Sequence, residues 1–592
     1  MVARPKTIVV GGGLAGLMAV IKIAEAGIPC QLFSFVPVKR SHSVCAQGGI
    51  NASVNTKGEG DSPQIHFYET VKGGDFLANQ PLAKGMCEGA PGIVYLLDRM
   101  GVPFSRTAEG LLDFRGFGGT LFSRTAFAGA TTGQQLLYAL DEQVRHFEAE
   151  GLVEKFEYWE FLSVVRDGDG VCRGIVAQDL RTMEIRVFPA DAVCLATGGN
   201  GVLYGKSTLS MVCTGSAAST VYQQGAIYAN GEFIQVHPTA IPGEDKHRLM
   251  SESARAEGGR MWVPKDGKPW YFLEDKYPKY KNLVPRDIAT REIYHVCRVL
   301  KLGVDGQDVV YLDLSHIPAE TLDRKLGGIL EIYEKFVGDD PRKVPMKVFP
   351  SVHYSMGGLW IDYEADGGGN IVVGSPRNHQ TNIPGLFAAG EVDYEYHGAN
   401  RLGANSLLSC FYGGMLAGPA MVNHAKGLER SCDAVEPSVF AAERKRQEEA
   451  YQRICALSGT ENPFVLHKEL GEIMTDNVSV VRYNDKLQAT DNAILAFMDR
   501  WKRIDINDAA QWANQAVSFT RQLWNMLELA RVITLGALRR DESRGAHYKP
   551  DFPDRNDGAW LKTTLATWTP SGPELRYAPV DISLLKPEAR KY

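Results

Sequence analysis

The sequence predicts an α/β protein that begins with a parallel sheet and a nucleotide-binding turn, and three observations support this fold class. A short apolar strand at residues 7–10 leads directly into the run GGGLAG at residues 11–16, which is a G-x-G-x-x-G turn. Residues 17–26 have the apolar spacing of a helix, and residues 30–35 read as a second strand. This order is the context in which the fingerprint binds a dinucleotide, and it predicts a Rossmann-like domain that binds FAD rather than NAD in a chain of this length.

Each glycine of the fingerprint has its own task. Gly11 permits the tight turn, Gly13 lets the backbone approach a pyrophosphate, and Gly16 allows the helix and strand to pack closely. The helix N-terminus supplies amide donors and a partial positive charge for the phosphates. Sites of this kind usually carry an acidic residue after the second strand to hold the ribose, whereas this chain has Ser34 there. We expect Ser34 to bind the ribose more weakly.

Two later segments read as further parts of the same domain. Residues 191–199, DAVCLATGG, form an apolar strand that closes on a turn of the kind found beside a dinucleotide, and residues 385–391, GLFAAGE, are a second strand-to-turn element. Glu391 is therefore expected to accept hydrogen bonds from ribityl or ribose hydroxyls. A solvated loop acid is the alternative.

At 592 residues the chain is too long for one core, so several domains are expected. They are a discontinuous FAD-binding domain at residues 1–236 and 350–425, an inserted α+β capping domain at 237–349, a helical domain at 426–540 and a C-terminal domain at 541–592. Amphipathic stretches at 439–455, 466–503 and 509–538 predict the helical domain. The C-terminal segment is rich in proline and polar residues, with weak periodicity.

Composition excludes several classes of protein. The 64 basic and 70 acidic residues give a formal net charge of −6, which argues against a nucleic-acid partner. No apolar run approaches the roughly 20 residues that span a bilayer, and no secretory leader pattern opens the chain. Ten scattered cysteines without a C-x-x-C pair fit reduced thiols in the cytoplasm. They predict no metal site here, so any iron–sulfur cluster must lie in a partner subunit.

A histidine is the most informative single residue. His42 stands in RSHSVCAQGG, residues 40–49, shortly after the fingerprint. This segment resembles the stretch of the succinate dehydrogenase and fumarate reductase flavoprotein subunits that carries a covalently bound FAD. The resemblance implies that a ring nitrogen of His42 bonds to the flavin 8α-methyl carbon, with Gly48 and Gly49 beside the cofactor. A surface or capping histidine is the alternative.

Five further segments extend the resemblance over nearly the whole chain. They are QVHPT at 235–239, SESARAEGG at 251–259, PRDIA at 285–289, VHYSMGG at 352–358 and HGANRLGANS at 397–406. Together with the segment around His42 they look like the family's complete motif set, which runs from residue 7 to ESRGAH at 542–547. The resemblance implies interconversion of succinate and fumarate, with hydride transfer between one methylene and the flavin and proton transfer at the other.

The resemblance also implies which side chains hold the dicarboxylate. They are His237, Ser251 or Thr239, His353 and Arg401, with Phe117 lining the pocket, while Asn405 and Ser406 join Glu391 at the cofactor. A guanidinium can grip a carboxylate in a bidentate fork, which lysine cannot reproduce. Because the ordinary pKa of histidine lies near neutrality, two histidines in the site also predict substrate binding that depends on pH.

The proton-transferring group implied by the family is Arg286, and a relay of Glu252 and Arg255 would restore its proton. A relay is needed because guanidinium keeps its proton at accessible pH. The spacing of Glu252 and Arg255 would place both on one helical face. An ordinary solvated helix pair is the alternative. Closure of the capping domain on the FAD-binding domain would assemble this site and exclude water.

Partners follow from the same resemblance. The motifs look nearest the bacterial enzymes in which the flavoprotein binds an iron–sulfur subunit and, through it, a single large cytochrome b that reaches the quinone at the cytoplasmic face of the plasma membrane. The run CTGS at residues 213–216 departs from the acidic pattern of many relatives. A stand-alone flavoenzyme with non-covalent FAD, such as an L-aspartate oxidase or a soluble fumarate reductase, is the first alternative. An electron-relay flavoprotein without substrate chemistry is the second.

Overall fold

The computed structural model describes residues 4–244, 246–508 and 510–590. Its centre is a five-stranded parallel sheet in the order β19-β10-β1-β2-β6. The strands are β1 (Thr7–Val10), β2 (Cys30–Ser34), β6 (Val153–Glu157), β10 (Ala192–Leu195) and β19 (Leu386–Ala388). The short apolar runs form strands because both faces of the sheet are covered, which is the usual condition of a parallel sheet. The α/β fold class and the strands expected from the sequence are confirmed.

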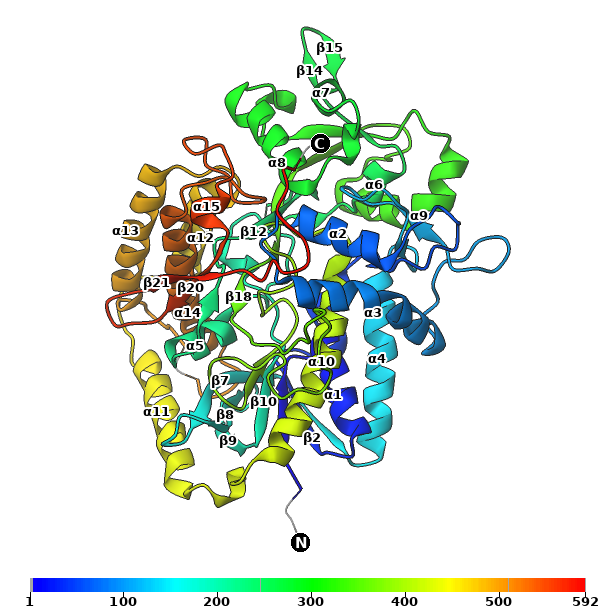
Figure 1. Cartoon of the computed structure of the whole chain (residues 1–592). Helices are drawn as coiled ribbons and strands as arrows, with labels where there is room; N and C mark the ends of the chain where they lie inside the picture. Colours follow the sequence, from blue (N-terminus) through cyan, green and yellow to red (C-terminus); the bar gives the residue numbers. More distant parts are fainter. Residues whose placement is uncertain (1–3, 245, 509, 591–592) are drawn as a thin grey trace.

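Helices cover one face of this sheet and a small antiparallel sheet covers the other (Figure 1). Helices α1 (Leu14–Glu25) and α10 (Asn405–Gly427) lie side by side. They approach closely because a Cβ at Gly414 would lie 2.4 Å from the carbonyl oxygen of Ala15. Also on the helical side are α2 (Pro63–Gly73), α3 (Gln80–Arg99) and α4 (Thr132–Ala149), and the antiparallel sheet is β7 (Trp159–Arg166), β8 (Cys172–Asp179) and β9 (Ile185–Pro189).

The capping segment is a six-stranded sheet in the order β13-β12-β17-β16-β14-β15, drawn in green at the top of Figure 1. Its strands are β12 (Ile234–Ile241), β13 (Arg248–Leu249), β14 (Arg260–Lys265), β15 (Lys268–Trp270), β16 (Val310–Asp313) and β17 (Met346–Ser355). Helices α6 (Ser253–Ala256), α8 (Arg286–Tyr294) and α9 (Ala319–Val337) accompany the sheet. Because β12 enters the segment and β17 leaves it as a pair, the segment is tied to the FAD-binding part by two adjacent strands.

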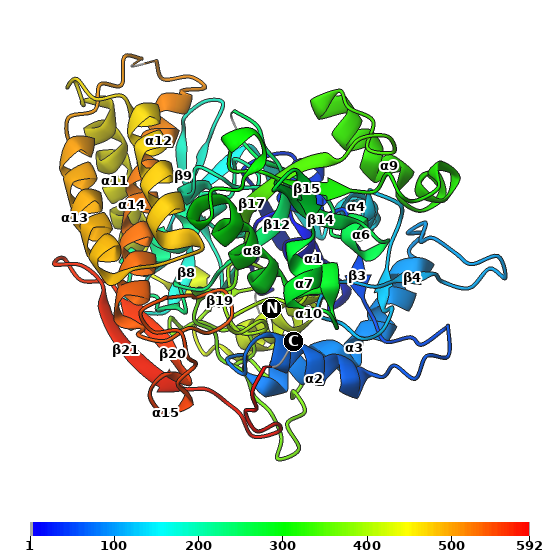
Figure 2. The same cartoon turned by 90° about the horizontal axis from the view of Figure 1, so that it is seen from above.

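Four helices stand together at one side of the molecule, as Figure 2 shows from above. They are α11 (Pro437–Cys455), α12 (Pro463–Met474), α13 (Asn484–Trp501) and α14 (Gln515–Arg539). The amphipathic stretch expected at 466–503 is two helices, because a π-helical turn at Thr475–Ser479 and non-helical residues after it separate α12 from α13. Ala509, where the third stretch was expected to begin, lies outside the described residues.

The C-terminal segment is more regular than its weak periodicity indicates. Strands β20 (Lys562–Thr567) and β21 (Glu574–Pro579) form a hairpin, and β20 pairs with β11 (Tyr228–Ala229), whose other neighbour is β18 (Gly358–Leu359). The tail therefore completes a sheet with strands that lie far away in the sequence. Among the described residues, no helix combines the length and the apolar character that crossing a bilayer requires.

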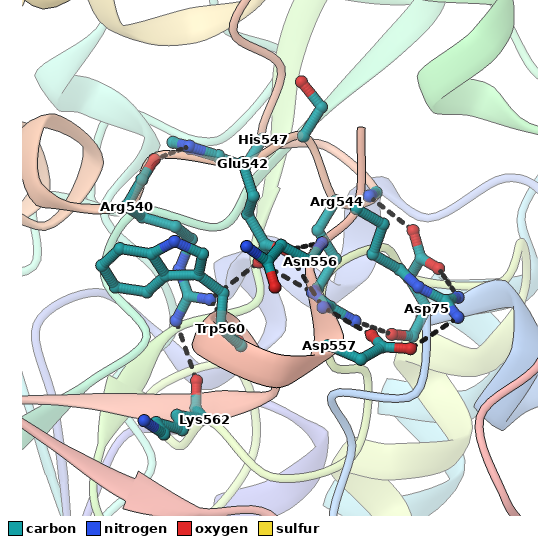
Figure 3. Close-up of polar contacts among 12 residues, drawn as sticks. Asp75, Arg540, Glu542, Arg544, His547, Asn556, Asp557, Trp560 and Lys562 are labelled. Atoms are coloured by element: carbon teal, nitrogen blue, oxygen red, sulfur yellow. Dashed lines mark hydrogen bonds and ion pairs between the residues drawn. The ribbon is translucent and has the colours of Figure 1, made fainter. Parts of the chain in front are cut away.

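A buried ion network joins the C-terminal segment to the FAD-binding part (Figure 3). Glu542 accepts from Arg540 at 3.0 Å and from Arg544 at 2.8 Å. Arg544 also pairs with Asp557 at 2.8 Å and donates to the backbone carbonyl of Asp75. Buried charges are tolerated when they are paired and hydrogen-bonded, as these are. Beside the network, the amide of Ala546 donates to the carbonyl of Ala399, so the ESRGAH motif supports the turn that leads to Arg401.

Candidate active site

A cavity of about 480 Å³ lies at the ends of the central strands, where the first turn, the segment around His42 and the capping segment meet. Ligands of open α/β sheets bind outside the carboxyl ends of the strands, so this is the expected place for a dinucleotide. Residues of the glycine fingerprint line one end of the cavity, and arginine and histidine side chains line the other. The two ends are described in turn.

The glycine fingerprint is required by close contacts within the chain. A Cβ at Gly11, where φ is +120°, would lie 2.1 Å from the carbonyl oxygen of Ala196, and one at Gly16 would lie 1.9 Å from the carbonyl oxygen of Gly11. Gly13 also lines the cavity but differs, because the nearest atom to an added Cβ there is Ser43 Oγ at 3.3 Å, with no backbone atom close by. Gly11 and Gly16 thus shape the turn, while Gly13 leaves space for a ligand.

Two polar side chains extend this end of the cavity. Ser34 lines it, but its hydroxyl donates to the carbonyl of Val36 at 2.5 Å, so only its lone pairs remain for a ribose hydroxyl. Glu391 is only 8% exposed and accepts from the amide of Ser355 at 2.9 Å, so it is not a solvated loop acid. Burial raises the pKa of its carboxyl to about 7. Position 199, beside the Glu391 carboxyl, requires glycine, because a Cβ there would lie 2.3 Å from Glu391 Oε1.

His42 faces the cavity from a short 3₁₀ helix, His42–Cys45. Its Nδ1 accepts a hydrogen bond from the amide of Ser210 at 3.2 Å. Nε2 takes no part in this bond. Burial, helped by the nearby charge of Lys246, lowers the pKa of the imidazole to about 4. His42 is therefore a half-buried, neutral residue of the cavity wall rather than a histidine of the open surface.

The loop that follows His42 is held by its glycines and by one arginine. A Cβ at Gly48 would lie 2.8 Å from the ring of Phe117, and one at Gly49, where φ is +132°, would lie 2.4 Å from the carbonyl oxygen of Ala126. Arg115 is buried and donates to the carbonyl of Gly48 at 3.0 Å. The loop is thus fixed against Phe117, which also lines the cavity.

At the other end of the cavity, Glu252 joins two arginines. Its Oε2 accepts from Arg286 Nη2 at 2.6 Å and Nε at 2.8 Å, and its Oε1 accepts from Arg255 Nη2 at 2.8 Å. All three side chains are buried, so the alternative of a solvated helix pair is wrong. Burial acts to raise the pKa of Glu252, but Arg286 and Arg255 outweigh it and the pKa is lowered. Glu252 stays ionised between two guanidinium groups.

Two histidines lie side by side in the wall of the cavity. The rings of His237 and His353 are 4.9 Å apart, and His353 Nδ1 lies 2.7 Å from the hydroxyl of Thr208. Burial, the largest cause, lowers the pKa of both imidazoles well below the ordinary value. The positive charges of nearby arginines lower it further. Both rings are therefore neutral at neutral pH, which corrects the expectation of titration near neutrality.

Two of the residues expected to touch a ligand do not line the cavity. Thr239 is fully buried, and its hydroxyl donates to the carbonyl of Met250 while its backbone contacts the ring of His237. Asn405 begins α10 and binds Asn51 and His66 through its side-chain oxygen. Thr239 and Asn405 thus support neighbouring residues. Ser251 and Ser406 do line the cavity, as do Glu391, Arg286 and Arg401.

Arg401 is a buried cation aimed at the cavity. Its side chain is 2% exposed, its guanidinium lies 4.4 Å from the ring centre of Tyr354, and its Nε has no hydrogen-bond partner. Burial, followed by the charge of Arg286, lowers its pKa to about 9. A buried charge without a partner is costly, so an anion bound in the cavity would stabilise this residue.

The balance of charge around Arg401 indicates the kind of anion. Three buried guanidinium groups, those of Arg255, Arg286 and Arg401, face the carboxylate of Glu252, and both histidines are neutral. While Glu391 beside Arg401 is protonated, this end of the cavity carries two uncompensated positive charges, which suits a dianion, and ionised Glu391 would cancel one of them.

Sequence reasoning passed over some residues of this region. Gln235, Thr208, Tyr354 and Lys246 all contact the residues described above or line the cavity. Gln235 and His237 are two apart on β12, so the alternation of side chains along a strand places both on one face and would have identified Gln235. No comparable signal marks Thr208, which reaches His353 through tertiary contact alone.

A glycine turn that fits a dinucleotide, in one cavity with a buried cluster of arginines that fits an anion, is the arrangement of an FAD-dependent oxidoreductase. Comparison with known proteins identifies the family within this class. Residues 6–407 match the family described as FAD binding domain, and residues 467–592 match the one described as fumarate reductase flavoprotein C-term. The chain belongs to the family of succinate dehydrogenase and fumarate reductase flavoprotein subunits.

Individual relatives agree with this assignment. The succinate dehydrogenase flavoprotein subunit of Bacillus subtilis is 66% identical over 592 residues, which is 100% of this chain and 99% of that protein. The fumarate reductase flavoprotein subunit of a Serratia species is 34% identical, with 99% of this chain and 96% of that protein covered. A solved quinol fumarate reductase from E. coli is similar with a TM-score of 0.90 at 32% identity, covering 99% of this chain and 98% of that one.

Proposed function

We propose that this chain is the catalytic subunit of a membrane-bound succinate:quinone or quinol:fumarate oxidoreductase, and that it interconverts succinate and fumarate. The observation that carries the proposal is the buried, doubly positive end of the cavity beside the dinucleotide cradle. Succinate is a dianion with a carboxylate at each end of a four-carbon chain, and its charge matches the two uncompensated positive charges.

The side chains divide into two groups by what they can hold. Arg401 grips one carboxylate through its guanidinium fork, and His237, His353 and Ser251 surround the remaining oxygens as hydrogen-bond partners. Held at both ends, the substrate keeps the orientation that the reaction needs. Bound FAD would supply the redox group, which takes a hydride when oxidised and gives one when reduced.

Proton transfer is assigned to Arg286. Its guanidinium lines the cavity and is held by Glu252 on the opposite side, so a proton given to fumarate would be replaced through Glu252. In the direction of succinate oxidation, Arg286 would first pass a proton to Glu252 and then take one from the substrate. Arg255 continues the contact from Glu252 toward the backbone carbonyl of Asn282. Because all three groups are buried, the relay works without open access of water to the reacting carbons.

The site is assembled from two parts of the chain. Ser251, Glu252 and Arg286 belong to the capping segment, while His42 and Arg401 belong to the FAD-binding part. We propose that movement of the capping segment about the adjacent strands β12 and β17 admits the substrate and closes the site.

We further propose that FAD is bound covalently through Nε2 of His42. The ring faces the cavity, and because Nδ1 accepts from the amide of Ser210 the neutral imidazole carries its proton on Nε2, so a bond from Nε2 to the flavin would replace that proton. After denaturation in acid, flavin fluorescence should migrate with the chain on a gel. The same fluorescence should be absent from His42→Ser.

His146→Ser provides the matched control for that experiment, because His146 is an exposed histidine on α4 and should keep the fluorescent band. Flavin that runs free of the wild-type chain would contradict the covalent bond. It would favour a stand-alone flavoenzyme with non-covalent FAD, such as an L-aspartate oxidase or a soluble fumarate reductase.

The shifted pKa values predict how binding depends on pH. Both histidines are neutral across the neutral range, whereas the pKa of Glu391 is raised by burial to about 7. Since Glu391 gains a negative charge as pH rises through that value, a dicarboxylate inhibitor such as malonate should bind more weakly above it. Titration of the flavin absorbance with malonate should show this trend in the wild type and not in Glu391→Gln. A trend that persists in Glu391→Gln would point to the histidines instead.

Partners are proposed on chemical grounds. Electrons leaving the flavin singly need iron–sulfur centres, and the ten cysteines of this chain are dispersed. We propose an iron–sulfur partner subunit, a single cytochrome b that anchors the complex and reaches the quinone, and a position at the cytoplasmic face of the plasma membrane. Purification of the tagged chain from native membranes should recover an iron–sulfur protein. Recovery of the chain alone would count against the complex.

A further inference from the structure

Gln235 lies between the two arginines that the mechanism requires. It is on β12, is 1% exposed and does not line the cavity. Its Oε1 accepts from Arg286 Nη1 at 3.0 Å, and its Nε2 donates to the backbone carbonyl of Arg401 at 2.7 Å. Nε2 also donates to Asn400 Oδ1 at 3.0 Å. One side chain thus contacts both the proton-transferring residue and the turn that carries the carboxylate-binding residue.

The orientation of this amide follows from its partners. Guanidinium has only donors, so the atom facing Arg286 must be the amide oxygen, and the two acceptors on the other side require the NH₂ group. Both hydrogens of the NH₂ group and one lone pair of the oxygen are used. A buried amide held by three hydrogen bonds is rigid, because any rotation would leave buried polar groups without partners.

A second route connects the same two elements. Asn400 donates to Asp287 Oδ1 at 3.2 Å, and Asp287 directly follows Arg286 at the start of α8. Arg590, near the end of the described chain, also binds both oxygens of Asp287 at 3.1 Å. Gln235, Asn400 and Asp287 therefore form a closed frame between α8 of the capping segment and the turn before α10.

The neutrality of Gln235 is part of the argument. Arg286 already has one carboxylate neighbour, Glu252, bound through Nε and Nη2. Gln235 fixes the remaining Nη1 without adding a negative charge, so the site keeps the two uncompensated positive charges that suit a dianion. A carboxylate in its place would still accept from Arg286 Nη1, but it would lose both hydrogen bonds that the amide donates and would remove one of those charges.

We propose that Gln235 is a positioning residue that fixes the guanidinium of Arg286 relative to the carboxylate held by Arg401. This inference rests on the proposed succinate–fumarate chemistry. Gln235 touches no substrate, so its loss should affect proton transfer far more than binding. Positioning of a proton-transfer group to within hydrogen-bond reach is what such a step requires.

Two substitutions separate orientation from charge. Gln235→Met keeps the length of the side chain and removes all three hydrogen bonds. In the flavin-loaded enzyme it should lower kcat for succinate by about 10- to 100-fold, the effect expected for losing hydrogen bonds to a charged group. It should raise the solvent deuterium isotope effect on kcat while leaving the dissociation constant of malonate within about threefold.

Gln235→Glu keeps an acceptor for Arg286 but adds a negative charge. It should retain a higher kcat than Gln235→Met and bind malonate more weakly than either the wild type or the methionine variant. The matched control is Gln178→Met. Gln178 is a buried strand glutamine that does not line the cavity; its Oε1 accepts from Arg521 at 2.7 Å and its Nε2 donates to the carbonyl of Met183.

The outcomes are distinct. Unchanged kcat in Gln235→Met would overturn the proposal. So would equal losses of kcat and malonate affinity without a change in isotope effect, since that pattern marks general disruption. If Gln235→Met does not fold, Gln235→Glu is compared with the wild type alone: it should bind malonate more weakly and turn over more slowly, and unchanged kcat and malonate affinity would overturn the proposal. A wild-type enzyme that neither oxidises succinate nor binds malonate would instead refute the proposed function itself.

Discussion

Arg286→Ala should retain its flavin and lose nearly all succinate oxidation, by roughly 10²- to 10⁴-fold or more, which is the range for removal of a general acid–base group. The loss is large because the guanidinium is the group between the cavity and Glu252, with Nη2 2.6 Å from the carboxylate. Steady-state turnover, measured with flavin content on the same sample, provides the test.

The same substitution also changes the charge of the site. Without Arg286, Glu252 keeps Arg255 as its partner, so the fold should survive and malonate affinity should fall less than turnover. Arg298→Ala is the matched control. Arg298 lies on the same stretch of chain but pairs with Asp308 at 2.5 Å, outside the cavity lining, and its loss should leave turnover near that of the wild type. Substantial residual turnover in Arg286→Ala would refute the proton-transfer role.

Arg401→Lys should bind malonate about 10- to 100-fold more weakly, although it nominally preserves the charge. Lysine cannot form the bidentate fork, and each hydrogen bond to a charged group is worth about 1.5–3 kcal/mol. Burial adds to the loss. Arg401 is 2% exposed and its own pKa is already lowered to about 9, so a lysine ammonium at this position should be neutral over much of the working pH range.

This second prediction can be checked by titrating the flavin absorbance with malonate at several pH values. As pH falls, the affinity of Arg401→Lys should rise more steeply than that of the wild type, because the lysine amine regains its proton in addition to the protonation of Glu391. Arg377→Lys serves as the control, since Arg377 is an exposed arginine that pairs with Asp362. Unaltered malonate affinity in Arg401→Lys would show that the carboxylate is held elsewhere.

Local pattern was sufficient for the start of the fold. The strand at Thr7–Val10, the glycine turn, helix α1 and the strand at Cys30–Ser34 follow one another without interruption, and each has its own periodicity. The later strands β10 and β19 were also recognisable, because short apolar runs that end in glycine turns are typical of buried parallel strands.

Other elements depend on contacts that are remote in the sequence. The apolar spacing continues through the π-helical turn at Thr475–Ser479, so periodicity gave no sign that α12 and α13 are separate. The hairpin of β20 and β21 has weak alternation, and its order comes from pairing with Tyr228–Ala229. Neither the break between α12 and α13 nor the β20–β21 hairpin can be predicted from the local sequence pattern.

In the site, too, some features could be predicted from the sequence and others depend on remote contacts. Resemblance supplied the residues, but it did not give their geometry: Glu252 and Arg286 are 34 positions apart and meet only in the folded chain. The neutral state of His237 and His353 arises from burial, which a sequence does not display. Asn405 shows what a motif does not convey: the motif points to the cofactor, whereas the side chain binds Asn51 and His66 and does not line the cavity.

Anaerobic addition of succinate to the purified, flavin-loaded protein tests the central claim most directly. The visible absorption band of the flavin should bleach on adding succinate and return on adding fumarate, because the buried cation site would hold both dicarboxylates beside the reacting ring. A flavin that bleaches with dithionite but is unaffected by succinate, with the capping segment intact, would contradict the assignment of this cavity to succinate–fumarate chemistry.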